Sequence, residues 1–365
     1  MVKSYFYAGN ETVGAYVRGV LAAHDWVCED APEDAEVVIT YFTTVTALED
    51  EYFGTDGIIK RAAPKALLID LSASTPNFAR DLSAVAQVND MRPVEAPIVV
   101  LDTTRDNAFS DPENIAAFVA GDKSDIEAAT AVLELIIGNA QVVGAAGSAV
   151  LARAALAIQV AAQIISAVEA DALYRAIQHD PASEGDIEGS AGAASPHAEQ
   201  VLSAVAEKRF SGTYTIEMFM GEIAAAMAAA DDVELVLPQL EAGMRVLELL
   251  AVIGGVDMSP AALALLYRDE DEVRAAGLDW SRAAEFYSDD SQRDDSDGSD
   301  SYDDYEGAVE GAHDHECCGG HHHGEGECSC GHDHHHEEDP YDGIGYDDGY
   351  AEREYQDADD FFSDR

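Results

Sequence analysis

The pattern of apolar residues changes abruptly near residue 146, and this change constrains the fold more than any other feature. Before it, short apolar runs rich in branched residues alternate with stretches of helical spacing, whereas residues 149–177 form one long Ala-rich apolar stretch. Strands buried on both faces of a parallel sheet appear as continuous apolar runs, and their alternation with helices indicates an α/β fold. We therefore expect a doubly wound, Rossmann-like α/β domain over residues 1–147 and an all-helical domain over residues 148–285.

The same periodicities predict the individual elements. Strands are expected at residues 3–9, 37–41, 66–71, 97–101 and 115–120. Helices are expected at residues 13–23, 46–53, 76–87, 125–137, 149–177, 197–206, 215–230, 238–254 and 260–266. Residues 184–196 contain several Gly and Ser, which indicates a loop between two of the helices.

The composition changes a second time after Trp280, where apolar residues become rare. Such a segment cannot bury enough surface to offset the entropy of an ordered chain, so residues 286–365 are predicted to be a disordered, acidic tail. From Asp289 onward, 27 acidic residues stand against 3 arginines, so this tail carries 24 of the 52 net negative charges of the chain.

The net charge of −52 excludes whole classes of partner. Affinity for phosphate comes chiefly from Lys and Arg, so we expect binding neither to nucleic acid nor to an anionic membrane surface.

No uncharged apolar run reaches the roughly 18 residues of a membrane-spanning helix. Residues 1–10 also lack the pattern of a signal peptide. The expected location is the cytoplasm.

Residues 313–336 concentrate nine His and four Cys. Imidazole and thiolate are ligands that zinc, nickel and copper prefer, so the segment is predicted to bind a divalent metal, nickel or zinc. The spacing is too loose for one fixed tetrahedral site and resembles the metal-storage tails of nickel-handling proteins. The alternatives are an acidic solubilising tail or an appended affinity tag. The candidate ligands are His313, His315, Cys317, Cys318, His321, His322, His323, Cys328, Cys330, His332, His334, His335 and His336.

The fifth cysteine, Cys28, is the only one outside this segment. It has no cysteine near it in sequence with which to form a disulfide, so we expect a buried free thiol.

Several local strings indicate a known family. They are AEVVIT at 35–40, YFGTDGI at 52–58, DLSASTP at 70–76, EAPI at 95–98, GD at 121–122, GAAG at 144–147, RFS at 209–211 and the helical stretch 216–227. In content and order they resemble the 3-hydroxyisobutyrate dehydrogenase family of β-hydroxyacid dehydrogenases, which are related to 6-phosphogluconate dehydrogenase. The resemblance implies a Rossmann-type domain for NAD(P), an all-helical domain, a homodimer and oxidoreductase activity.

The resemblance places the dinucleotide turn at residues 8–14, AGNETVG, where the family has GxGxxG. Gly9 and Gly14 are therefore the candidate cofactor-binding residues, because glycines let backbone amides at the helix start approach the pyrophosphate. Glu11 lies beside the place of the phosphates and would repel them. The chain also passes from Val27 to Ala35 almost at once, so the second strand and helix of the domain are expected to be deleted. The alternative is that residues 27–29 rebuild that strand in a shorter form.

The resemblance also assigns the substrate site. Arg153 stands at the position of the family's catalytic Lys, and Ser72 is the one retained polar substrate contact. Arg stays protonated, so it can hold an anion but cannot act as a general base. The alternatives are that Ser72 caps the helix at 76–87 and that Arg153 forms a buried ion pair with Glu169 or Glu222. The family's later Lys falls on Gly221.

Three functions remain open from the sequence. One is a non-catalytic homodimer that serves as a scaffold for the metal-binding tail. The second is an NAD(P)H-dependent oxidoreductase, similar to a hydroxyacid or imine reductase, with an altered active site. The third is a regulator that retains a small ligand in the former cleft, which a filled cleft would exclude.

Overall fold

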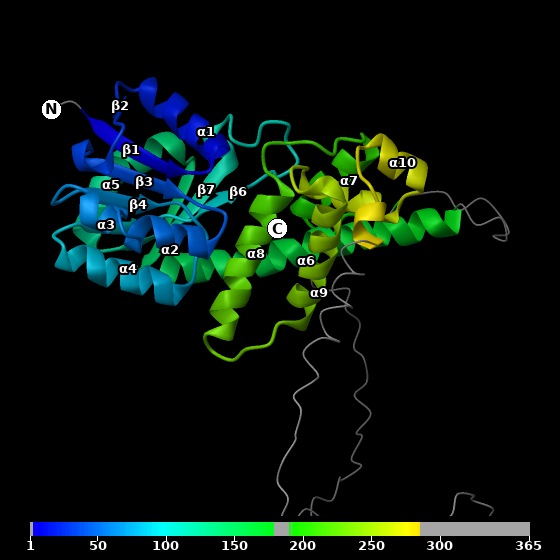
Figure 1. Cartoon of the computed structure of the whole chain (residues 1–365). Coiled ribbons are helices and arrows are strands. Elements are labelled where there is room, and N and C mark those ends of the chain that lie inside the picture. Colours follow the sequence, from blue (N-terminus) through cyan, green and yellow to red (C-terminus); the bar gives the residue numbers. More distant parts are fainter. Residues whose placement is uncertain (1–2, 179–189, 191, 285–365) are drawn as a thin grey trace, which may run out of the picture. The chain divides into compact units, whose positions relative to one another are not determined.

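The computed structural model describes residues 3–178, 190 and 192–284, which lie within one compact unit of the chain. A twisted sheet with flanking helices forms the first part of this unit, and helices form the second (Figure 1). The predicted ligands in residues 313–336 lie outside the described residues.

The sheet has the order β2-β1-β3-β4-β5-β7-β6, and β8 pairs with β7. Its strands are β1 (Ser4–Gly9), β2 (Val27–Cys28), β3 (Val37–Tyr41), β4 (Leu67–Asp70), β5 (Arg92–Glu95), β6 (Ile98–Val100), β7 (Ile115–Gly121) and β8 (Asn139–Gly144). Strands β1 to β5 and the pair β7 and β8 run parallel, whereas β7 is antiparallel to β5 and β6, so the sheet is mixed.

The second strand is present, which corrects the expected deletion. Val27 and Cys28 pair in parallel with Ser4 and Tyr5 of β1. The crossover helix that should follow is replaced by a single 3₁₀ turn at Pro32–Asp34. Cys28 is exposed rather than buried, because a two-residue strand at the sheet edge gives its side chains little cover.

Helices cover both faces of the sheet, as the alternating apolar runs predict. One face carries α1 (Glu11–Ala22) and α5 (Lys123–Ile136), which contact each other. The other carries α2 (Val45–Phe53), α3 (Ile58–Arg61) and α4 (Pro76–Val88). Within β3, Val38 joins the core under α2 to α4 while Ile39 joins the opposite core, as expected from alternating side-chain directions along a strand.

The described residues of the second part form helices joined by loops, with no strand among them, as predicted. It contains α6 (Ser148–Gln178), α7 (Pro196–Ala206), α8 (Ile216–Asp231), α9 (Pro238–Leu250), a π-helical turn (Ala251–Gly255), a 3₁₀ helix (Pro260–Tyr267) and α10 (Glu270–Ala275). Helix α6 joins the parts by contacting β7 and β8 as well as α7, α8 and α9.

Helix α6 is long and apolar enough to pass a test for a membrane span, and the bent pair Pro238–Gly255 and Pro260–Tyr267 passes it together. The core helix of a soluble protein passes the same test, so this is weak evidence for a membrane.

Candidate functional site: the junction of the sheet and the helices

In open α/β sheets, ligands bind beyond the carboxyl ends of the parallel strands. Here β1, β3 and β4 end at Gly9, Tyr41 and Asp70, and α1 begins directly after β1. Any dinucleotide site must therefore use the turn after β1 and the space between these strand ends and the helical part.

Contacts within the chain itself require glycine at both positions of the turn. Gly9 has φ +126°, and a Cβ there would overlap the carbonyl oxygen of Tyr41. A Cβ on Gly14 would lie 2.6 Å from the ring of Tyr7. Gly9 retains the tight turn that the family needs, but the Tyr7 ring occupies the space beside Gly14.

Asn10 already bonds the amides at the start of α1. Its Oδ1 accepts hydrogen bonds from the backbone N–H of Thr12 at 3.0 Å and of Val13 at 3.3 Å. Free N–H groups at a helix start are what makes it an anion site, so this cap competes with a phosphate for the same donors. Glu11 adds a negative charge in the same turn and forms an ion pair with Arg18.

Arg153, the expected catalytic position, lies buried on α6 and forms an ion pair with Glu222 of α8. Its Nε donates to the carbonyl of Ile98 at 2.9 Å, and the hydroxyl of Tyr214 donates to Glu222 Oε2 at 2.7 Å. Of the two expected acids, the partner is Glu222 and not Glu169. Burial lowers the pKa of Arg153, but the Glu222 carboxylate outweighs it, so the pKa is raised and the guanidinium stays charged.

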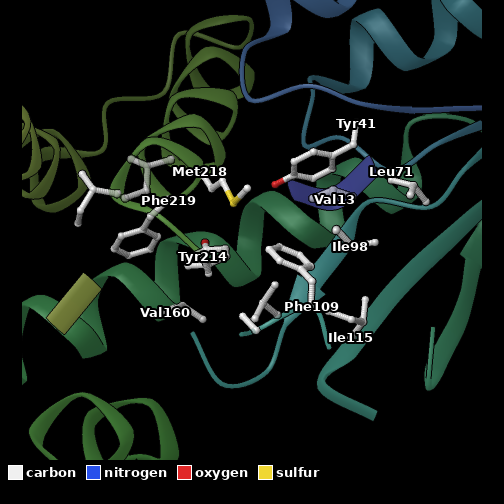
Figure 2. Close-up of a cluster of buried hydrophobic side chains, with 14 of the residues drawn as sticks. Val13, Tyr41, Leu71, Ile98, Phe109, Ile115, Val160, Tyr214, Met218 and Phe219 are labelled. Atoms are coloured by element: carbon white, nitrogen blue, oxygen red, sulfur yellow. The ribbon is translucent and has the colours of Figure 1, made fainter. Parts of the chain in front are cut away.

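Side chains from both parts pack together at the junction. One continuous hydrophobic core includes Tyr41, Leu71 and Ile98 from the sheet side together with residues of α6 and α8. Figure 2 shows Tyr41, Tyr214, Met218 and other members converging in this cluster. Burial raises the pKa of Tyr41 and that of Tyr214 well above the usual phenol value, so both remain neutral hydrogen-bonding groups.

Gly221 lets α8 close onto the sheet. A Cβ on Gly221 would overlap the carbonyl oxygen of Thr43, so the helix backbone lies directly against the loop after β3. The Thr43 hydroxyl also donates to Glu217 Oε1 at 3.2 Å, which ties the same helix to the same loop. The absence of the family's Lys at this position is therefore linked to close packing of the two parts.

Ser72 is neither a helix cap nor an accessible contact. Its hydroxyl donates to Asp70 Oδ1 at 2.6 Å and accepts the N–H of Phe42 at 3.0 Å. The cap of α4 is Thr75, whose side chain accepts from the N–H of Phe78 at 3.2 Å. The expected N-cap role is therefore wrong, because the chain turns three residues later than the cap hypothesis requires. Ser72 is fully buried and joins the ends of β3 and β4.

Two buried carboxylates beside Ser72 were not singled out from the sequence. Asp70 and Glu95 are register partners at the ends of β4 and β5. Burial raises the pKa of Asp70 to about 6. Glu95 also has a raised pKa because of burial, and its Oε1 accepts the N–H of Gly147 at 2.6 Å, just before α6. An acid at the end of an apolar run, as in LLID, is the signal that could have identified Asp70, whereas RPVE gives no such signal for Glu95.

Among the described residues, no group of three or more His, Cys, Asp and Glu side chains could hold a metal ion. Two features of the turn and the junction oppose the binding of NAD(P). Two of the helix-start donors are bonded to Asn10, and the buried Arg153–Glu222 pair ties α6 to α8 beside Tyr41 and Tyr214.

The comparisons agree with the fold. The family described as the NAD binding domain of 6-phosphogluconate dehydrogenase matches residues 10–144. The uncharacterized oxidoreductase YkwC of Bacillus subtilis is 31% identical over 142 residues, which are 39% of this chain and 48% of that protein. A probable 3-hydroxyisobutyrate dehydrogenase of Mycobacterium tuberculosis is 31% identical over 173 residues, 47% of this chain and 54% of that protein. The chain thus spans about half the length of these curated relatives.

Two solved structures share the fold. The 3-hydroxyisobutyrate dehydrogenase of Mycobacterium tuberculosis with L-serine aligns with a TM-score of 0.55 at 20% identity, over 74% of this chain and 100% of that one. Psf3 in complex with NADP+ and 2-OPP aligns with a TM-score of 0.58 at 15% identity, over 73% and 100%. Residues 10–144 and the relatives named 3-hydroxyisobutyrate dehydrogenase support membership in the 3-hydroxyisobutyrate dehydrogenase family, and the two solved structures share its fold.

Proposed function

We propose that this member of an oxidoreductase family is a non-catalytic scaffold that acts as a cytoplasmic homodimer and carries a nickel- or zinc-binding tail. One observation supports the loss of catalysis above all others. At the position of the family's catalytic Lys, this chain has Arg153, which is buried and forms an ion pair with Glu222. A guanidinium in that state can neither exchange a proton with a substrate nor hold a substrate anion.

The turn after β1 supports the same proposal independently. A dinucleotide would have to displace the Asn10 side chain from two backbone amides and tolerate the carboxylate of Glu11. The regulator hypothesis, which needs a small ligand in the same space, is disfavoured by the buried side chains there.

Exposed apolar side chains on α6 support the proposed homodimer. This helix of 31 residues leaves Leu151, Leu173 and Ile177 exposed although its composition is strongly apolar. Exposed apolar side chains along one long helix favour a protein partner, and a second copy of the chain is the partner that the family resemblance implies.

The metal function rests on the sequence of residues 313–336 alone, where thirteen imidazole and thiolate groups are available. Replacing Cys317, Cys318, Cys328 and Cys330 by Ser in the full chain would separate thiolate from imidazole binding. Zinc depends on thiolate more strongly than nickel does in sites of mixed donors, so we expect the zinc stoichiometry to fall further than the nickel stoichiometry.

The decisive experiment is calorimetric titration of NADPH and NADH into the full-length protein, with a catalytic 3-hydroxyisobutyrate dehydrogenase as positive control. No heat of cofactor binding, together with uptake of nickel or zinc, is the expected result. Micromolar cofactor binding would contradict the proposal and favour the second candidate, an NAD(P)H-dependent hydroxyacid or imine reductase with an altered site. The match of residues 10–144 to an NAD binding domain and the retained turn at Gly9 are the observations on its side.

A further inference from the structure

The helical part contains an open cavity of ≈ 260 Å³ to which the described residues of the sheet contribute nothing. Its walls combine apolar groups with two cations and one acid. The lining residues are Lys208, Phe210, Leu265, Arg268, Glu272, Ala275 and Ala276. In a chain with net charge −52, a concave site with more cations than acids among its lining residues is unusual.

Arg268 follows the 3₁₀ helix and is the best-placed binding group of this cavity. Its side chain is only 14% exposed, yet its nearest carboxylates, Asp171 and Glu272, both lie at 3.8 Å. Among the described residues, its guanidinium makes only these two long ion pairs. A largely buried guanidinium with five donors and such loose partners is suited to a planar carboxylate, which it can bind through two parallel hydrogen bonds.

Lys208 is held at the cavity by a backbone conformation that its residue type does not favour. It has φ +55° just after α7, where the next N–H, of Arg209, returns to the carbonyl of Ala204. Gly or Asn is the usual residue at such a helix end, because a Cβ is strained in the left-handed region. The Lys208 ammonium reaches Glu272 Oε1 at 3.2 Å, so it lies beside the same acid that Arg268 approaches.

We propose that this cavity binds a small monocarboxylate with a compact apolar body. The carboxylate bonds Arg268 and competes with Glu272 for Lys208, while the apolar body contacts Phe210 and Leu265. The volume lies below the range of about 300–1,000 Å³ that is common for drug-sized ligands, so the ligand is small. Inorganic phosphate and sulfate fit less well, because they leave the apolar walls without contact.

The site is tested with benzoate and its neutral isostere benzamide, each titrated into the full-length protein and followed by ligand-observed NMR. Benzoate should bind at least about tenfold more tightly than benzamide, because only the anion makes charge-assisted bonds to Arg268. Equal binding of the two compounds, or no benzoate binding at millimolar concentration, would overturn the proposal.

Variants then locate the binding. Ala275→Phe fills the cavity from an exposed position without removing a charge, and Arg268→Gln removes the main donor. Both should lose benzoate binding. The control is Arg274→Gln on the same short helix, since Arg274 is 71% exposed and does not line the cavity. Unchanged binding in Ala275→Phe would show that benzoate binds elsewhere and would refute the assignment.

Glu272→Gln gives a result that mere damage to the fold cannot imitate. Removing the competing carboxylate frees Lys208 and leaves Arg268 with Asp171 alone, so benzoate affinity should rise about fivefold. A loss of affinity in this variant would contradict the proposed competition. The outcome is independent of the proposed scaffold function, because the described residues of the dinucleotide turn and of the junction take no part in this cavity.

Discussion

The junction and the helical cavity each contain an Arg and a Glu, but they use the pair in opposite ways. Arg153 and Glu222 are in direct contact, buried, and completed by bonds to the Ile98 carbonyl and the Tyr214 hydroxyl. Arg268 and Glu272 are 3.8 Å apart beside open space. The comparison teaches that a buried ion pair cannot bind a ligand when neighbouring groups satisfy all its donors and acceptors. A pair whose donors are not satisfied can still bind one.

Breaking the closed pair should have the largest effect. Arg153→Met leaves the Glu222 charge buried without its partner, which should reduce the free energy of unfolding by about 3–5 kcal/mol. Urea unfolding measures this loss. The double variant Arg153→Met, Glu222→Gln should recover most of it, because the amide still accepts from Tyr214. Lys123→Met is the matched control, since the pair of Lys123 and Glu127 is exposed and should contribute less than about 1 kcal/mol. Equal losses in both single variants would refute the distinction.

The stability of the sheet side of the junction should depend on pH through Asp70, whose pKa is raised by burial from 3.8 to about 6. Between those values the folded chain holds a proton that the unfolded chain has released. The contribution of Asp70 to stability is therefore complete below pH 4 and is lost as the pH rises through 6. The loss is roughly 3 kcal/mol at most.

The measurement is the free energy of unfolding of the native protein relative to Asp70→Asn, at several pH values from 4 to 8. The Asn variant stays neutral in both states, so the difference isolates the titration of Asp70. A difference that does not change with pH would show that Asp70 keeps an ordinary pKa.

The close approach of α8 to the sheet is tested by adding one methyl group. Gly221→Ala forces the helix away from the Thr43 carbonyl and should cost about 1–3 kcal/mol of stability. Gly19→Ala is the matched helical control, because Gly19 is exposed on α1 and a Cβ there meets nothing within 4 Å. That control should stabilise by up to about 1 kcal/mol. Thermal denaturation of the two variants would distinguish a tight junction from a loose one.

The smallest effect is expected at the open cavity. Lys208→Gly removes the strain of a left-handed lysine and should stabilise the fold by about 0.5–1 kcal/mol, measured by urea unfolding. The same variant should weaken benzoate binding. Stabilisation with unchanged binding would remove Lys208 from the proposed site, and destabilisation would show that its side chain serves the fold instead.

Much of the fold could be predicted because its signals are local. Apolar runs at 37–41 and 66–71 become β3 and β4, and helical periodicity predicts α4 and α6 to within one or two residues at each end. The strands β5 and β8 were not predicted, because RPVE and NAQVVG are too polar to read as buried strands. Their place in the sheet comes from backbone pairing with β4 and β7, which depends little on side-chain type.

The candidate site was predicted less well, because its state depends on contacts between distant residues. The sequence identified Gly9, Gly14, Ser72 and Arg153 through the family resemblance, but it left the partner of Arg153 open and gave Ser72 the wrong structural role. It also did not identify Asn10 as the group that caps α1. Each of these outcomes depends on which side chain lies within hydrogen-bond distance of a given donor or acceptor. Tertiary packing determines this, and a sequence motif does not.

The sequence by itself determined the division into an α/β part and a helical part, the family resemblance and the acidic character of the chain, because periodicity, motif strings and charge are properties of neighbouring residues. Only the tertiary structure decided that the two parts pack tightly at the junction while a cavity in the helical part stays open. The reason is that Arg153 contacts Glu222, and Gly221 contacts Thr43, although the residues of each pair are far apart in sequence. A local sequence pattern cannot predict such contacts.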